Sequence, residues 1–259
     1  MRLSQAQLNL LERCPRQFQH IYLDRLGSPT NPEQQERQTW GSRFHLLMQQ
    51  RELGLPIESF IQEDPQLQRW MTAFASVAPE ILTSDRTPQT FRESEHCRTL
   101  QVQDYLLTVV YDLLIAGETK AQILDWKTYQ EPQNKRKLEQ WQTRLYLYVL
   151  AQTSDYLPEQ ISMTYWFIQS EDKPQSLQFT YTQAQHEKIG KQLNRLLSQL
   201  TDWLQGYERG EPFPQVADDS QHCEYCQYAT RCDRDRFDGE ETVNQNWLQN
   251  LAQIQEVSL

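Results

Sequence analysis

Long apolar runs are missing from this 259-residue chain. The longest mostly apolar stretch, YLLTVVYDLLIA, covers residues 105–116 and contains an aspartate. A membrane-spanning helix needs about 20 apolar residues, so this stretch is too short to cross a bilayer. The opening residues, MRLSQAQLNLLERCPRQF, contain no continuous apolar segment of the kind found in a secretion signal. We therefore expect a cytoplasmic protein that does not associate with membranes.

Positive charge is also scarce. The chain has 25 Lys and Arg against 35 Asp and Glu, which gives a net charge of −10. This balance argues against a protein that coats nucleic acid nonspecifically, because such proteins neutralise phosphates with an excess of cations. It does not exclude an enzyme that meets a phosphate backbone locally. Hydrophobic residues make up 38% of the chain, with seven Trp and twelve Tyr, so we expect a globular fold.

The hydrophobic pattern predicts helices on both sides of a β-rich middle, without repeats or low-complexity tracts. The first helix is expected to begin after Ser4, a residue that caps helices well. The expected helices cover residues 4–26, 36–53, 64–78, 134–152, 183–207 and 243–256. The expected strands cover residues 90–101, 104–116, 121–129, 161–170 and 176–182. The fold class is α/β with one central sheet.

Two charged side chains, Asp125 and Lys127, interrupt the apolar strand QILDWKTY. Because side chains alternate along a strand, they point to one face with Ile123, and Leu124 and Trp126 point to the other. Burying two ionisable groups costs several kcal/mol unless they are paired or bind a ligand. A structural ion pair is the commoner explanation for an isolated Asp-x-Lys, and it stays open on these residues alone.

A second aspartate interrupts the preceding strand at VVYDLLI. We expect Asp112 to share a face with Val110 and Leu114. If the two strands pair as a hairpin through residues 116–120, the carboxylates of Asp112 and Asp125 come close together. Like charges need a cation between them, and hard oxygen ligands favour Mg²⁺ or Mn²⁺. Lys127 would then orient or polarise a water beside the metal.

Two helical motifs flank these strands. GSRFH places His45 four residues after Gly41, and WQTRLYLY places Gln142 and Tyr146 one helical turn apart. Taken singly, each has a structural explanation, since a lone helical histidine or a partly buried tyrosine is common. In chain order, the set is a Gly-xxx-His helix, a strand aspartate, an Asp-Trp-Lys strand and a Gln-xxx-Tyr helix.

This order of motifs resembles the PD-(D/E)XK nuclease superfamily and, within it, the RecB-like branch. The resemblance begins at LSQAQLNLLERCPRQFQHIYL and extends to the last cysteine. It implies a restriction-endonuclease-like core, which is a central mixed sheet flanked by helices. It also implies a metal-dependent deoxyribonuclease that hydrolyses phosphodiester bonds, as an exonuclease on single-stranded DNA ends. The expected setting is DNA repair, recombination or CRISPR-type DNA processing, with protein partners that the residues do not identify.

The resemblance also implies roles for the motif residues. One or two Mg²⁺ or Mn²⁺ ions would be held by His45, Asp112, Asp125 and the backbone carbonyl of Trp126. Lys127 would position the attacking water. Relatives often have a glycine before the strand aspartate and an arginine after it, and VVYDLL has neither.

A further set of residues is expected to contact the DNA. The resemblance implies that Gln142 and Tyr146 contact the strand near the scissile phosphate. Glu95 lies in a strand where relatives often carry a glutamate, and we group it with the DNA-facing candidates. Basic residues gather at the start of the Gln142 helix, which makes a further DNA-facing set of Lys135, Arg136, Lys137 and Arg144.

Three of the five cysteines lie close together in HCEYCQYATRCD, as Cys223, Cys226 and Cys232. An odd number without a secretion signal speaks against a disulfide framework, and this spacing favours zinc or an iron–sulfur cluster. Either needs a fourth ligand. His222 would complete a zinc site, and Cys14 would complete a four-cysteine site.

The resemblance favours the second arrangement. RecB-like nucleases of the AddB and CRISPR-adaptation kinds carry a 4Fe–4S cluster with one cysteine before the nuclease motifs and three after them. Cys14, in ERCPRQF, matches the first of these. The cluster would join the N-terminal helix to the C-terminal segment, so its loss should destabilise the protein. Zinc and free thiols stay open as alternatives, and Cys97 is expected to be an ordinary core or surface residue.

We expect one nuclease domain over residues 1–259. Within it, residues 1–35 form the N-terminal helix with the first cluster cysteine, 36–182 the nuclease core, 183–235 the long helix and cysteine triplet, and 236–259 a tail. Two other functions remain open: a non-cleaving DNA-binding or scaffold subunit with the same fold, and a nuclease stapled by zinc.

Overall fold

A computed structural model describes residues 1–27, 32–82, 90–131, 138, 140–169, 173–217 and 220–234. The chain divides into two compact units, Met1–Pro214 and Gln215–Leu259. The boundary between these units falls inside residues 183–235, one of the four segments expected from the sequence. The division into those four segments stays a prediction. The predicted helix over 243–256 lies outside the described residues.

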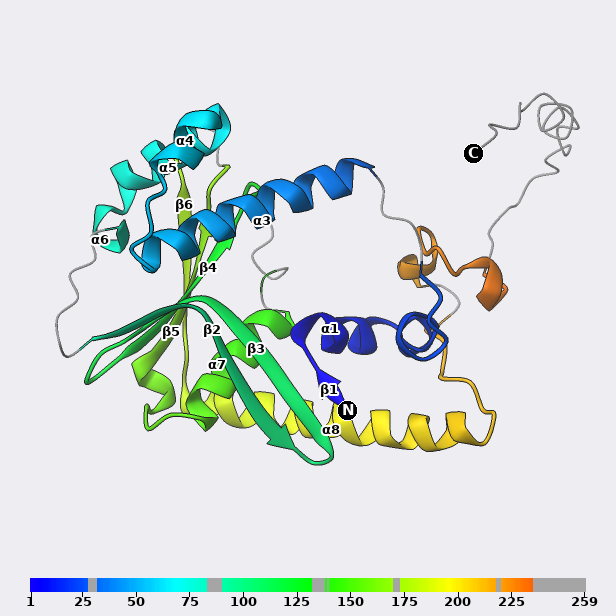
Figure 1. Ribbon diagram of the computed structural model, residues 1–259. Helices are drawn as coiled ribbons and strands as arrows, with labels where there is room; N and C mark the ends of the chain where they lie inside the picture. Colours follow the sequence, from blue (N-terminus) through cyan, green and yellow to red (C-terminus); the bar gives the residue numbers. More distant parts are fainter. Residues whose placement is uncertain are drawn as a thin grey trace, which may run out of the picture. The chain divides into compact units, whose positions relative to one another are not determined.

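The first unit is built on a six-stranded mixed sheet (Figure 1). The strands are β1 (Arg2–Leu3), β2 (Phe91–Val102), β3 (Tyr105–Ala116), β4 (Ala121–Lys127), β5 (Ile161–Phe167) and β6 (Gln175–Thr180). The order is β1-β3-β4-β5-β6, with β2 paired to β3. The pairs β1–β3 and β4–β5 are parallel, and the other pairs are antiparallel. The predicted central sheet is confirmed.

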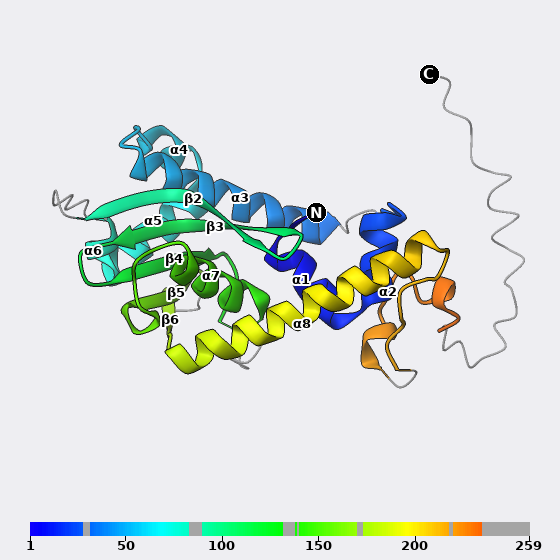
Figure 2. The same ribbon diagram turned by 90° about the horizontal axis from the view of Figure 1, so that it is seen from below.

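Helices cover both faces of this sheet, as Figures 1 and 2 show. One core packs against α1 (Gln5–Arg13), α7 (Trp141–Gln152) and α8 (Gln183–Glu208). A second core packs against α3 (Pro32–Glu52), α5 (Pro65–Val77) and α6 (Pro79–Leu82), with the short α4 (Glu58–Glu63) alongside. We call these the α7 core and the α3 core. α1, α5 and α8 each bury one apolar stripe, whereas α7 is buried on nearly all sides between the sheet and α8.

The N-terminal helix differs from its prediction. Ser4 does cap α1, through a capping box with Gln7. The helix then ends at Arg13, and α2 (Pro15–Phe18) and a π-helical turn (Gln19–Leu23) follow it instead of one continuous helix. The break falls before Pro15, because proline disfavours helical backbone in the preceding residue. Cys14 takes an extended backbone and caps α2, where its Sγ accepts from the N–H of Gln17 at 3.4 Å.

The second unit is described as far as residue 234 and contains two short 3₁₀ turns, Gln221–Cys223 and Thr230–Cys232. Its ends are held by Gln215, which donates to the carbonyl of Cys232 at 3.3 Å and accepts from Arg234 at 2.9 Å. Between residues 220 and 234, backbone hydrogen bonds of short turns, such as that from the N–H of Ala229 to the carbonyl of Cys226 at 3.0 Å, order the chain.

Candidate active site

Asp112 lies where the hairpin of β3 and β4 stops pairing. The ladder between these strands ends at Leu113 opposite Leu124. Beyond it, the N–H of Trp126 donates to Oδ2 of Asp112 at 2.7 Å. The predicted hairpin is confirmed, and a carboxylate takes the place of a backbone acceptor at its open end.

The alternation of side chains along β3 changes at this aspartate. Tyr111 is buried in the α7 core, whereas Leu113, two residues further, is buried in the α3 core. Opposite Asp112, β2 carries Glu95, whose φ of +52° lies in the left-handed region. That backbone conformation costs a non-glycine residue about 1–2 kcal/mol. The two strands therefore share one irregularity, and it lies at a pair of facing carboxylates.

This irregularity overturns one sequence-based expectation. Asp112 was expected to share a face with Val110 and Leu114. Asp112 faces His45 of α3, whereas Leu114 is fully buried in the α7 core. A strict two-residue period cannot hold through a strand whose partner adopts a positive φ.

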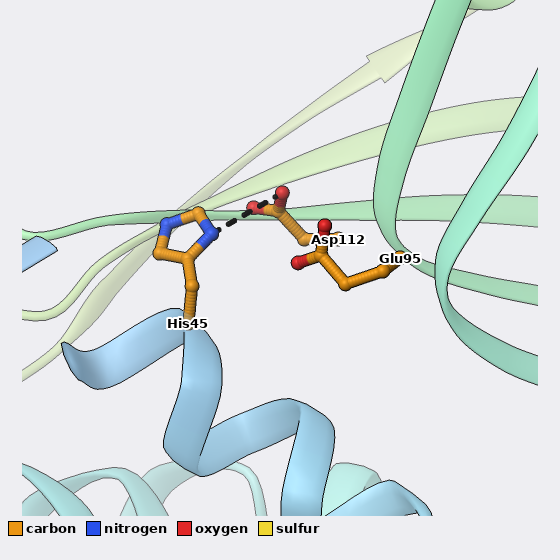
Figure 3. A group of neighbouring side chains, drawn as sticks. All are labelled: His45, Glu95 and Asp112. Atoms are coloured by element: carbon orange, nitrogen blue, oxygen red, sulfur yellow. Dashed lines mark ion pairs between the residues drawn. The ribbon is translucent and has the colours of Figure 1, made fainter. Parts of the chain in front are cut away.

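His45 of α3 completes a cluster with these two carboxylates (Figure 3). Its Nδ1 lies 3.4 Å from Oδ1 of Asp112, and its Nε2 donates to the carbonyl of Trp126 at 3.0 Å. Ligand atoms of His45, Glu95 and Asp112 all lie within 4.8 Å of one another. Within the described ranges, this is the one group of three or more such side chains near enough to share a metal ion.

The electrostatics of the cluster favour a cation. Burial alone would lower the pKa of His45, but the hydrogen bond and charge of Asp112 raise it to about 9. Burial and the neighbouring Asp112 raise the pKa of Glu95. A site that retains a proton on imidazole and disfavours a second carboxylate charge has excess negative potential. Two carboxylates, an imidazole and a nearby carbonyl are donors that suit Mg²⁺ or Mn²⁺.

Gly41 brings α3 close enough for His45 to reach the strand. A Cβ at this position would lie 3.2 Å from Oγ1 of Thr128, just after β4. A larger side chain here would push the helix away from the strand end. The Gly-xxx-His spacing therefore has a structural explanation. Gly41 allows the helix to pack closely on Thr128, and His45, one turn later, reaches the carbonyl of Trp126.

Asp125 and Lys127 share one face of β4, as predicted, and the structure shows that α7 covers this face. Asp125 is 1% exposed and forms an ion pair with Lys127. Gln142 of α7 bridges the two, donating to Asp125 Oδ2 at 2.5 Å and accepting from Lys127 Nζ at 3.1 Å. Burial raises the pKa of Asp125, and the Lys127 cation opposes that rise. Burial acts to lower the pKa of Lys127, but Asp125 holds it above its ordinary value.

Tyr146 is 4% exposed and hydrogen-bonds Gln142, one turn earlier in α7. Burial raises the pKa of its hydroxyl, so the group is a neutral phenol at ordinary pH. The predicted pairing of these two residues on one helical face is confirmed. Their contact with DNA remains a prediction.

Tyr165 of β5 belongs to this group but was not identified from the sequence. It lies opposite Asp125 in the parallel ladder, and Lys127 Nζ lies 5.2 Å from the centroid of its ring. Its hydroxyl is 2.7 Å from Oγ1 of Thr143 on α7. Only the pairing register places Tyr165 there, and no motif in the sequence marks it.

The remaining basic candidates are not all at this site. Arg144 lies on another side of α7, 3.4 Å from Glu12 and 5.5 Å from the Trp141 ring centroid. Lys135, Arg136 and Lys137 lie outside the described residues.

None of the five cysteines forms a disulfide within the described part of the chain. Cys14 lies in the first unit, and Cys223, Cys226 and Cys232 lie in the second. The N–H of Cys226 donates to the carbonyl of Cys223 at 3.2 Å, so a tight turn separates these two. Cys97 is exposed on β2. Shared ligation by four of the thiols remains a prediction.

Comparison with known proteins agrees with this fold. A family model described as the PD-(D/E)XK nuclease superfamily matches residues 2–233. A solved structure from Eubacterium rectale, described as a candidate exonuclease, is similar with a TM-score of 0.52 and 10% identity, over 85% of this chain and 86% of that chain. The structure of SSO0001 gives a TM-score of 0.37 and 13% identity, over 89% of this chain and 85% of that chain. No curated protein sequence matches the chain.

A mixed sheet between two helical layers, with a histidine, aspartates and a lysine at a strand end, defines a nuclease-type core. The chain belongs to the PD-(D/E)XK nuclease superfamily. At 10% identity, the similarity to the Eubacterium rectale structure is evidence for the fold alone. In the described ranges, none of the helices is long and apolar enough to cross a membrane.

Proposed function

We propose that the protein is a Mg²⁺- or Mn²⁺-dependent deoxyribonuclease of the RecB-like type that acts on single-stranded DNA ends. The observation that carries this proposal is the arrangement of two groups around β4. His45, Glu95 and Asp112 form a metal-ligand cluster on the α3 side, and Asp125, Lys127 and Gln142 form a hydrogen-bonded group on the α7 side.

The donor set fits a hard divalent ion. His45, Glu95 and Asp112 would hold it, together with the carbonyl of Trp126, which contacts His45, and Asp125, whose charge acts on His45 across the strand end. A bound ion would stabilise negative charge on the phosphate and lower the pKa of a coordinated water. Glu95 moves from the DNA-facing candidates to the metal ligands in this proposal, because it lies with His45 and Asp112.

The chain's own groups supply the rest of the chemistry. Lys127 is buried beside Asp125, so its cation is held in one place for a phosphate oxygen or for the attacking water. Gln142 fixes both side chains at once, which limits their motion when substrate binds. The presence of Asp112, Asp125 and Lys127 together, each held by a hydrogen bond or an ion pair, favours an enzyme over a non-cleaving scaffold.

An assay with end-labelled DNA tests the proposal. Wild-type protein is expected to shorten labelled single strands with Mn²⁺ or Mg²⁺ and to stop in EDTA. Lys127→Ala and Asp125→Ala should abolish cleavage, whereas Asp155→Ala, at an exposed site, should not. Labels at the 5′ and 3′ ends, on single and double strands, report the polarity and the substrate preference. Binding of DNA without cleavage in Mn²⁺ would overturn the enzymatic proposal in favour of a scaffold.

We also propose that Cys14, Cys223, Cys226 and Cys232 hold a structural 4Fe–4S cluster. None of the four is in a disulfide, and three of them lie within ten residues of one another, a spacing typical of a metal or iron–sulfur site. Protein purified without oxygen should be brown and contain about four iron and four sulfide per chain. One zinc per chain in colourless protein would assign the site to zinc instead. Serine at Cys14 should lower the iron content, and serine at the exposed Cys97 should not.

A further inference from the structure

Three cations lie on one face of α8, and the proposed active site uses none of them. The first is Lys188, and Lys191 and Arg195 follow it by three and seven residues. At these spacings the three side chains lie along one side of the helix. All three are exposed, and none forms an ion pair with another residue in the described part of the chain. Glu187, four residues before Lys191, instead accepts from Gln183 at 3.1 Å. We call these three residues the basic stripe.

A pocket of about 200 Å³ opens beside this stripe, where α8 meets α7 and the end of β6. Figure 2 shows α8 starting next to β6 and passing α7. Leu147, Phe179 and Ile189 give the pocket apolar walls, and Arg144 and Lys188 stand at its edge with two glutamines of α8. Lys188 belongs to both features, so the stripe and the pocket are continuous.

The combination of these features selects one kind of ligand. The pocket is smaller than the about 300–1,000 Å³ of sites for drug-sized molecules, and its apolar walls and amides match a single nucleobase. A row of cations beside it matches the phosphates on either side of that base. A base in a duplex must first be unpaired and unstacked, which costs a few kcal/mol, so a single strand offers its base to such a pocket more readily.

The pocket is linked to the active site through two residues. Thr143 lines the pocket, and its Oγ1 lies 2.7 Å from the hydroxyl of Tyr165. The other side of Tyr165 faces Lys127, whose Nζ is 5.2 Å from the ring centroid. The contact of Arg144 with Glu12 is long, at 3.4 Å, and exposed, so it is weak enough to exchange for a phosphate.

We propose that α8 and this pocket form a second binding site for single-stranded DNA, outside the catalytic cluster. Phosphates lie along the basic stripe, and one base enters the pocket beside Phe179. The proposal rests on the proposed function, because it assigns this surface to the strand that the nuclease cleaves.

Binding of a fluorescent oligothymidine to the full-length protein in EDTA tests the stripe. The variant K188A/K191A/R195A is compared with R69A/K120A/K173A, which loses the same charge at exposed sites elsewhere. Removing three phosphate contacts should lower the slope of log K against log salt by about 2, and weaken binding about 10-fold or more. The control variant should bind like the wild type. Equal losses in the two variants, or no loss in either, would overturn the proposal.

An abasic oligomer with the same number of phosphates tests the pocket. Wild-type protein should bind it about 5-fold or more weakly than oligothymidine, and Phe179→Leu should reduce that difference. If the abasic strand binds equally well, no base enters the pocket and this half of the proposal is wrong. If polyglutamate displaces DNA at equal charge concentration, the surface is a general acidic-protein site and the assignment to DNA fails.

A small substrate separates this proposal from the proposed function. Thymidine 5′-(p-nitrophenyl phosphate) needs only the catalytic cluster, so the wild type and the stripe variant should cleave it equally with Mn²⁺. If the wild type cleaves neither this ester nor DNA, the proposed function fails, while the binding measurements still decide whether the stripe holds a single strand.

Discussion

At the scale of single residues, Asp112 shows how the site is assembled. One carboxylate accepts from the backbone of Trp126 through Oδ2 and faces His45 through Oδ1. It therefore fixes the end of β4 and contributes to the metal-ligand cluster at once. The substitution Asp112→Asn removes the negative charge and keeps an oxygen acceptor, so it separates these two roles.

Tyr165 is a positioning residue for Lys127. The ring holds the cation by a cation–π contact, and the hydroxyl is anchored by Thr143. We expect Tyr165→Phe, which keeps the ring, to retain most of the cleavage rate. Tyr165→Leu should lower kcat by about 2- to 30-fold, the range that corresponds to a cation–π contact, with little change in KM. Steady-state cleavage of the thymidine ester measures both constants. If Phe and Leu lose kcat equally, the ring does not position the lysine.

Glu95 stores backbone strain at the site. Its φ of +52° disfavours any residue with a Cβ, whereas glycine adopts it freely. We expect Glu95→Gly to be about 1 kcal/mol more stable than Glu95→Ala, since the glycine relieves the strain. Urea unfolding of both variants measures the difference. An alanine variant at least as stable as the glycine variant would show that the strand relaxes on its own.

At the scale of elements, the contact between α7 and α8 depends on a neutral histidine. His186 stacks on Tyr148 with ring centroids 4.8 Å apart, and its Nδ1 lies 2.9 Å from the hydroxyl of Tyr181. Its Nε2 lies 2.7 Å from Nε2 of Gln152, which suits an unprotonated acceptor. Burial lowers the pKa of His186 below its ordinary value.

This lowered pKa gives a pH dependence with a defined sign. The unfolded chain binds a proton at this histidine more readily, so the stabilisation is present above about pH 6.5 and is lost as the pH falls through the folded-state pKa. We expect the wild type to lose more unfolding free energy than His186→Gln between about pH 7 and pH 5. Thermal and urea unfolding at both pH values provide the comparison. Parallel pH profiles for the two proteins would contradict it.

At the scale of the whole molecule, metal binding should be linked to folding. The cluster of His45, Glu95 and Asp112 gathers negative potential in the folded state, and the unfolded chain does not. We expect Mn²⁺ at about 100 times its Kd to raise the unfolding free energy of the wild type by about 2.7 kcal/mol. Asp112→Asn should show little of this effect and cleave DNA at least about 100-fold more slowly, while Asp155→Asn should match the wild type. An equal Mn²⁺ response in all three proteins would place the metal elsewhere.

The sequence alone determined the class of fold and most of the motif residues, because these depend on local properties. Alternation predicted that Asp125 and Lys127 share a face, and helical spacing predicted that Gln142 and Tyr146 share another. The hairpin of β3 and β4 followed from two apolar runs and a short turn. Such features need only the period of each element and the order of the elements along the chain.

Only the tertiary structure decided which of these groups meet. It placed Glu95 with His45 and Asp112, through a strand irregularity that no two-residue period predicts. It placed Tyr165 under Lys127, because the register of two parallel strands distant in sequence sets that contact. Register and helix approach depend on packing between elements, and packing is a property of the folded chain as a whole.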